Sequence, residues 1–154
     1  SSKEDIIMPI KSFRGLLADG QELRIRLGTI RGEIGYKIKK FQIITNLPGA
    51  GSDYASVVKL RSQPMGDGVA TTAIVNFDSG VLLGVAWTSG DSATPNNYLE
   101  TVVFDNVVFN QDIFVTHKET IGSQGCNYYL ELEQVKLNLD EATVATLKDM
   151  RGRE

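Results

Sequence analysis

The acidic residues placed to do chemistry together are Glu131 and Glu133, which stand two residues apart in an alternating segment. Side chains at i and i+2 of a strand share one face, so the two carboxylates would lie near each other. Retaining glycosidases use a pair of carboxylates about 5–5.5 Å apart. Nothing else in the sequence resembles a glycosidase, and a polar strand face explains the pair better.

The chain has one histidine, His117, and one cysteine, Cys126. One imidazole is too few for a multi-histidine metal site, and one thiol excludes an internal disulfide framework. A general base would also need a nucleophile, and the sequence has no G-x-S-x-G motif. We interpret His117 as a solvent-facing or lightly hydrogen-bonded side chain and Cys126 as a small packed residue. The sequence therefore predicts a protein that is not an enzyme and uses no cofactor.

Aspartates recur in segments rich in turn residues, at Asp19, Asp53, Asp67, Asp78 and Asp91. Loop carboxylates can hold calcium, but aspartate is also favoured in turns because it bonds to its own backbone. No stretch has the spacing of an EF-hand loop. We interpret these aspartates as turn residues, predict no metal site, and expect chelators to leave the protein unaffected.

Basic residues would form a stripe if their strands were neighbours: Arg24, Arg26, Lys37, Lys39 and Lys40. Such a stripe would suit phosphate or an acidic partner subunit, but a solvated sheet face explains these residues better. The net charge of −3 argues weakly against a dedicated nucleic-acid binder.

Three aromatic residues flank the loops that are expected to be exposed, namely Tyr54, Trp87 and Tyr98. Exposed aromatic rings beside loops rich in Asn and Asp would suit the stacking of sugars. Trp87 stands in the apolar run VLLGVAWT, so a core role explains it better.

A length of 154 residues is most simply one domain. Short β-branched and aromatic runs, separated by turn residues, have the spacing of a sandwich or barrel and predict an all-β fold. Of the two, we expect a two-sheet antiparallel β-sandwich with a short C-terminal α-helix. Apolar residues at alternate positions predict the core. The predicted core residues are Leu23, Ile25, Leu27, Ile38, Phe41, Ile43, Leu83, Val85, Ile113, Val115, Leu130 and Leu132.

Local signals add four expectations. The doubled Lys39-Lys40 marks a β-bulge, and the change of parity near Gln134 marks a second bulge or a crossing between sheets. The segment 69–77 is predicted as a strand because it is rich in Val, Ile and Thr. The glycines of 122–125 predict a hairpin between the two last strands.

The two ends differ from the middle, so we expect an arm at 1–8, a sandwich domain at 9–137 and a helix with its tail at 138–154. Asn138 and Glu141 suit a helix N-terminus. A short arm and a three-turn helix are marginal alone, so we expect both ends to contact neighbouring subunits. The expected assembly contacts are Ile6, Ile7, Leu139, Val144, Leu147 and Met150. No apolar run reaches the ~20 residues of a membrane helix, so no membrane partner is expected.

The segments FDNVVFNQDIFVTHKE, NYYLELEQVKL and VATLKDMR resemble small β-rich virion structural proteins of marine bacteriophages. The segments IKSFRGLLADG and IGYKIKKFQI fit the same resemblance. The resemblance implies an antiparallel β-sandwich, jelly-roll-like, that is a capsid or capsid-decoration subunit and acts by self-assembly. Its partners would be copies of itself and other virion proteins, and its place the virion, assembled in the host cytoplasm. The resemblance carries over no functional residues.

The alternative function is a lectin-like, carbohydrate-binding β-sandwich module that mediates surface attachment. A large symmetric assembly favours the virion protein, and a monomer that binds glycans favours the module.

Overall fold

The computed structural model describes residues 9–28, 33–48, 53–65, 72–91 and 98–137. The expected arm at 1–8, the expected helix at 138–154 and Asp67 lie outside these residues. So do the expected assembly contacts Ile6, Ile7, Leu139, Val144, Leu147 and Met150. The described elements are eight strands: β1 (Ile10–Leu17), β2 (Glu22–Ile25), β3 (Ile34–Thr45), β4 (Tyr54–Arg61), β5 (Leu82–Gly90), β6 (Tyr98–Phe104), β7 (Ile113–Glu119) and β8 (Cys126–Lys136).

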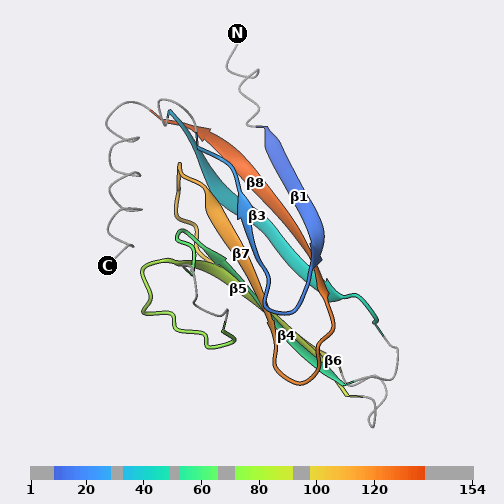
Figure 1. Cartoon of the computed structure of the whole chain (residues 1–154). Helices are drawn as coiled ribbons and strands as arrows, with labels where there is room; N and C mark the ends of the chain where they lie inside the picture. Colours follow the sequence, from blue (N-terminus) through green and yellow to red (C-terminus); the bar gives the residue numbers. More distant parts are fainter. Residues whose placement is uncertain (1–8, 29–32, 49–52, 66–71, 92–97, 138–154) are drawn as a thin grey trace.

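The strands form two antiparallel sheets that face each other (Figure 1). The smaller sheet has the order β1-β8-β3, and the larger has the order β2-β7-β4-β5-β6. The predicted all-β fold with antiparallel sheets is confirmed. Because the strand order is not sequential, most connections leave one sheet and enter the other. Only β4, β5 and β6 follow one another as direct neighbours.

The core lies between the sheets and is built from the alternation that the sequence predicts. Phe13 of β1, Leu130 of β8 and Phe41 of β3 stand in one cross-strand row of the smaller sheet. Leu60 of β4 and Val115 of β7 form a matching row of the larger sheet. All the predicted core residues are buried except Leu23, which is half-buried against the core, but Val85 lies outside the cluster between the sheets, on the face of β5 that also carries Trp87.

The bulge expected at Lys39-Lys40 is confirmed. The register of β3 against β8 shifts between Ile38 and Lys40, which leaves Lys39 without an opposite residue. The extra residue keeps both Ile38 and Phe41 directed at the core.

The second bulge, expected near Gln134, is wrong. β8 keeps its register with β3 through Lys136. Val135 and Leu137 instead pack with Val108 in a small separate cluster. The change of parity therefore marks a second apolar contact at the end of β8, which sequence spacing alone does not distinguish from a bulge.

The hairpin expected at 122–125 is also wrong, because β7 and β8 belong to different sheets. The carboxylate of Glu119, at the end of β7, accepts hydrogen bonds from the backbone N–H groups of Ile121 and Gly122. The Thr120 N–H donates to the carbonyl of Ala55 in β4. These bonds hold the start of the link against β4, and the chain then crosses to the smaller sheet.

The strand expected at 69–77 is absent over its described part, 72–77. The Ile74 N–H donates to Thr72 Oγ1, and the Asp78 N–H donates to Asn76 Oδ1. Short-range bonds of this kind compete with a sheet ladder. The ammonium group of Lys59 in β4 donates a hydrogen bond of 2.8 Å to the carbonyl of Ile74, which ties this segment to the larger sheet.

Candidate functional site

The carboxylates of Glu131 and Glu133 are engaged on the outer face of the smaller sheet. Glu133 forms ion pairs with Lys37 at 3.2 Å and Lys39 at 3.9 Å. Glu131 accepts a hydrogen bond from the Tyr129 hydroxyl at 2.6 Å, which raises the pKa of Tyr129. Both carboxylates therefore have local structural partners, as expected of a polar strand face.

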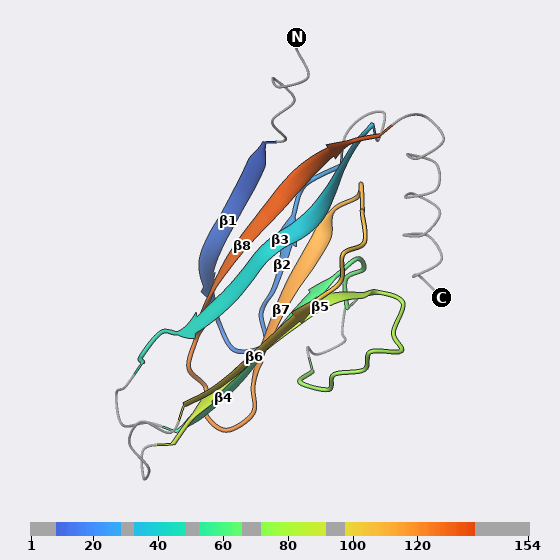
Figure 2. The same cartoon turned by 180° about the vertical axis from the view of Figure 1, so that it is seen from behind.

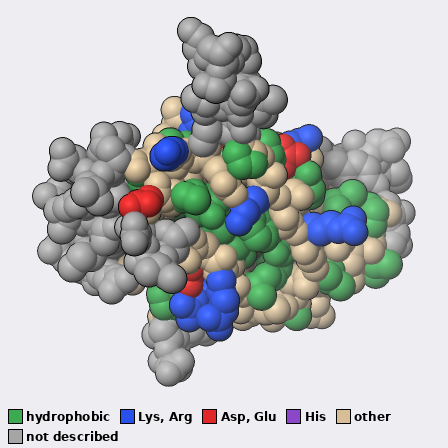
Figure 3. Space-filling model, turned by 90° about the horizontal axis from the view of Figure 1, so that it is seen from above, with side chains coloured by type: hydrophobic (Ala, Val, Ile, Leu, Met, Phe, Trp, Pro, Cys, Tyr) green, Lys and Arg blue, Asp and Glu red, His purple; other side chains and the backbone are tan. Residues whose placement is uncertain are grey.

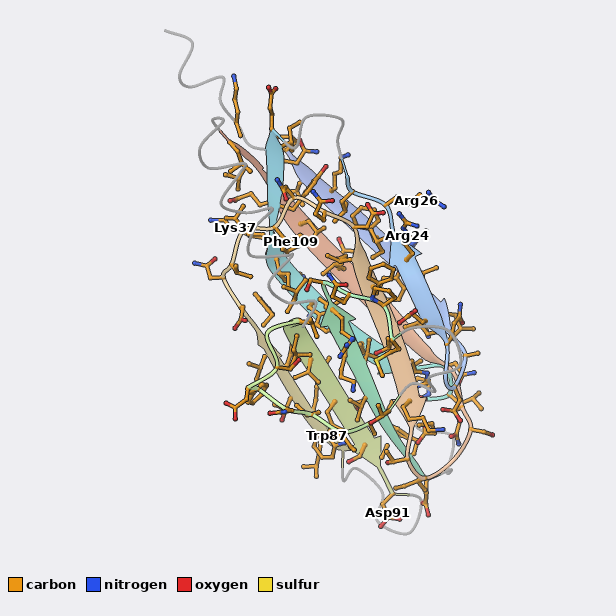
Figure 4. The ribbon with its side chains drawn as sticks, turned by 60° about the vertical axis from the view of Figure 1, so that its left-hand side comes forward. Arg24, Arg26, Lys37, Trp87, Asp91 and Phe109 are labelled. Atoms are coloured by element: carbon orange, nitrogen blue, oxygen red, sulfur yellow. The ribbon has the colours of Figure 1, made fainter. Side chains whose placement is uncertain are left out.

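The five basic residues do not form one stripe, because the strands that carry them are not neighbours in one sheet. Arg24 belongs to β2, and Arg26 follows it at one edge of the larger sheet, whereas the three lysines lie on β3 of the smaller sheet. Figure 4 shows Arg24 and Arg26 together on one side and Lys37 on the other. Seen from above, the Lys and Arg side chains also fall into separate groups (Figure 3). The alternation of apolar and polar residues within a strand does not indicate which sheet the strand joins. The sequence alone therefore could not separate the arginines from the lysines.

His117 is fully buried inside β7, which contradicts the solvent-facing interpretation, although it does make the expected hydrogen bond. Its Nδ1 lies 3.1 Å from the carbonyl of Ala18. Cys126 is packed as predicted, with no exposed surface, and burial raises the pKa of its thiol to about 12. A thiol with that pKa is protonated at neutral pH and is a poor nucleophile.

Among the loop aspartates that the structure describes, Asp19 has a structural role. Asp19 accepts a hydrogen bond from the Glu119 N–H at 2.8 Å and pairs with Lys118 at 3.6 Å. Within the described ranges, no three side chains of His, Cys, Asp or Glu gather in a group able to hold a metal ion.

Tyr54 and Trp87, the two of these aromatic residues whose side chains the structure describes, do not form a shared stacking surface. Tyr54 is buried, and its ring packs against Gly90. A Cβ atom added at Gly90 would lie 2.6 Å from the nearest ring carbon of Tyr54. Trp87 is half-buried on the face of β5 that points away from the core (Figure 4). The core role expected for Trp87 is therefore wrong. The side chain of Tyr98 lies outside the described residues.

Asp112 is a structural residue that the sequence did not single out. Its carboxylate accepts hydrogen bonds from the N–H groups of Leu27 at 2.6 Å and Gly28 at 2.8 Å. It also accepts Arg24 Nε at 2.7 Å and lies 2.6 Å from another guanidinium nitrogen of Arg24. Partial burial alone would raise the pKa of Asp112, but the two amides and Arg24 outweigh it and lower the pKa. The only available signal was an aspartate placed directly before an apolar strand.

A hollow of about 430 Å³ lies beside Asp112, at the end of the larger sheet. Its walls are mostly polar, with Phe114 as the aromatic member. The lining residues are Arg24, Arg26, Gly28, Ser62, Gln63, Pro64, Gln111, Asp112 and Phe114. Guanidinium, carboxamide and carboxylate groups beside a ring are the groups that recognise sugar hydroxyls.

The four sheet edges differ in how they are protected against pairing with another chain. Edge strands are commonly blunted by Lys or Arg, Pro, bulges or short length. β1 has Lys11 and Arg14, and β2 is only four residues long. β3 has three lysines and a bulge, and Phe109 bridges to it at Tyr36.

The edge strand β6, with the sequence YLETVVF, has none of these protections. Its one charged residue is Glu100. Leu99 is 51% exposed and Val103 is 43% exposed, and both point to the outer face beside Trp87. Figure 2 shows β6 at the near edge of the larger sheet. This strand is the apolar, unpaired edge of the described structure.

No protein-family model matches the chain, and no curated protein matches it either. No helix in the described portion of the chain has the length and apolar character needed to cross a membrane.

Proposed function

We propose that the two sheets are those of a jelly roll. When an antiparallel hairpin of eight strands folds over on itself, strand 1 meets strand 8, 2 meets 7, 3 meets 6 and 4 meets 5. The pairs β1–β8, β2–β7 and β4–β5 support this order. The fourth pair is supported by the Tyr36–Phe109 bridge, which joins β3 to the segment after β6. β6 itself departs from the pattern by pairing with β5.

From this order follows a structural role: a non-enzymatic subunit of a bacteriophage particle, in the capsid shell or its decoration. The strand order is the observation that carries the proposal, because jelly rolls recur in viral capsid proteins. A fold hosts many functions, so the surface must agree as well. The engaged carboxylates, the buried His117 and the unprotected edge of β6 agree with a role in assembly better than with one in chemistry.

The partners in this proposal are copies of the chain and other virion proteins, and the location is the virion. The terminal segments would supply the contacts proposed at Ile6, Ile7, Leu139, Val144, Leu147 and Met150. Sedimentation of the full chain, followed by electron microscopy of the fastest fraction, tests the role. We expect uniform, symmetric assemblies, and a chain that stays monomeric at all concentrations would refute it.

The polar hollow favours the second candidate, a carbohydrate-binding module. Its volume of about 430 Å³ falls in the range of small-ligand sites. Under this alternative, the monomer binds defined sugars on a glycan array, and Arg26→Ala abolishes the signal. An array without bound glycan, read on folded protein, would remove the candidate.

A further inference from the structure

We infer that two copies of the chain pair through β6, edge to edge and antiparallel, about a two-fold axis at Thr101. The inference deepens the proposed assembly role by naming one contact of the subunit. The product would be one continuous sheet that contains the larger sheets of both copies.

The unused backbone groups of β6 follow from its pairing with β5. The Asp105 N–H donates to the Leu83 carbonyl at 2.9 Å, and Val103 stands opposite Val85. In an antiparallel ladder, hydrogen-bonded and non-hydrogen-bonded pairs alternate. Asp105, Val103, Thr101 and Leu99 therefore bond toward β5. The N–H and C=O groups of the residues between them point away from the sheet and are available to another strand.

These available groups limit the register of a symmetric pair. The residues whose backbone N–H and C=O groups point away from β5 include Glu100, Val102 and Phe104. In a symmetric pair, these backbone groups must bond to one another across the axis. An axis at Glu100 would set two like charges opposite each other, which is destabilising. An axis at Val102 would set the apolar Leu99 against Asp105 of the second copy. An axis at Thr101 avoids both conflicts.

In the register centred on Thr101, the exposed side chains match. Leu99 faces Val103 of the second copy, and the symmetry repeats this apolar contact on the other side of the axis. Glu100 bonds through the backbone to Val102 of the second copy, so the two Glu100 carboxylates are diagonal neighbours, about 7–8 Å apart, and not directly opposite each other. The two copies of Thr101 meet as a non-hydrogen-bonded pair, in which side chains approach most closely. The arrangement places Leu99 and Val103, the apolar residues on the outer face of β6, in contact across the two copies.

Other occupants of this edge are a terminal segment of the same chain and a different virion protein. Neither would place two copies of Thr101 together. The experiment below therefore separates a second copy from both of them.

The variant Thr101→Cys tests the axis directly. Opposite residues of a non-hydrogen-bonded pair have Cα atoms about 4.5 Å apart, which is within the range of a disulfide. The native Cys126 is fully buried and does not compete. Val103→Cys is the matched control, because the offset of four residues from its symmetry mate corresponds to about 13 Å along the strand.

Under mild oxidation of the full chain, we expect Thr101→Cys to cross-link into dimers at least roughly tenfold faster than Val103→Cys. Equal rates would mean random collision, and no cross-linking of either variant would mean that another occupant or solvent covers the edge. Either result overturns the inference. Folding of each variant is checked by its circular-dichroism spectrum and its melting temperature.

A second pair of variants tests the register independently. Leu99→Lys with Val103→Lys sets like charges opposite each other across the axis and should abolish the Thr101→Cys cross-link. Leu99→Lys with Val103→Glu sets opposite charges together and should restore it. If both double variants behave alike, the register is wrong.

Failure of this inference and failure of the assembly role are distinguishable. Particles that form without the Thr101→Cys cross-link would leave the assembly role standing and remove the β6 contact. Cross-linked dimers that never grow into particles would support the β6 contact and remove the assembly role.

Discussion

At the scale of single residues, Asp112 ties the loop after β2 to the start of β7. Its carboxylate accepts the Leu27 and Gly28 amides and both binding nitrogens of Arg24. Asp112→Asn replaces one acceptor oxygen with a donor, which leaves at least one donor unpaired. We expect the free energy of unfolding to fall by about 1–3 kcal/mol in urea denaturation. Asp105→Asn, at an exposed position after β6, is the control and should change it little.

The same carboxylate predicts a pH dependence. Because the pKa of Asp112 is lower in the folded chain than in the unfolded chain, its stabilisation is complete above the unfolded value of about 3.9. The stabilisation is lost as the pH falls through the folded pKa. When the pH is lowered from 6 to about 3 or below, the wild type should therefore lose more unfolding free energy than Asp112→Asn. Equal losses in the two proteins would show that the bonds of Asp112 do not lower its pKa.

Leu130 tests the core. It is fully buried in β8, in a cross-strand row between Phe13 and Phe41. Leu130→Ala should cost about 2–5 kcal/mol of unfolding free energy, because it loses transfer energy and leaves a cavity. Leu16→Ala removes the same atoms from a leucine that is 55% exposed on β1. If the two variants lose the same stability, Leu130 does not lie in a packed core.

At the scale of elements, the bulge in β3 predicts that deleting Lys39 and deleting Ile38 lower the stability by different amounts. Deleting Lys39 leaves every cross-strand pair with β8 in place, because the register already skips this residue. It removes an ion pair with Glu133 at 3.9 Å, which is worth about 0–1 kcal/mol. Deleting Ile38 instead puts Lys39 opposite Leu132, facing the core.

We therefore expect the Ile38 deletion to cost at least about 2–5 kcal/mol more than the Lys39 deletion, judged from the lost core side chain alone. Thermal or urea unfolding of both proteins measures the difference. Equal loss in both would place the bulge elsewhere in β3.

Alternation was enough to predict the strands and their inward faces, because burial of one face imposes a period of two whatever the partner strand is. It was not enough to predict sheet membership. The glycines of 122–125 read as a hairpin, but β7 and β8 belong to different sheets, and Glu119 and Thr120 bond to Ala55 of β4, which is distant in sequence. For the same reason, the sequence could not show that Arg24 and Lys37 belong to different sheets.

The polar sites were predicted least well, for the same reason. Asp112 gains its contacts from residues 84–88 positions away. His117 is buried because β7 lies second from the edge of the larger sheet and faces the core. Neither context exists in the local sequence. The polar face of Glu131 and Glu133 was predictable because it follows from the alternation within β8 alone. The ion pairs of Glu133 with Lys37 and Lys39 were not predictable in this way.

At the scale of the whole molecule, the two described sheets have one edge that lacks the usual protection. β1, β2 and β3 are charged, short or bulged, whereas β6 presents Leu99 and Val103 on its outer face and has one charged residue. An exposed apolar edge promotes uncontrolled association in a protein that must stay monomeric. In a subunit of a particle, the same edge is a defined contact.

The central claim is that the chain works by assembling with itself. Sedimentation velocity of the full chain over a wide range of concentrations measures this most directly. We predict a concentration-dependent shift from monomer to a discrete, fast-sedimenting species that electron microscopy shows to be symmetric. A single monomer peak at every concentration, from protein with a folded β-sheet spectrum, would contradict the account.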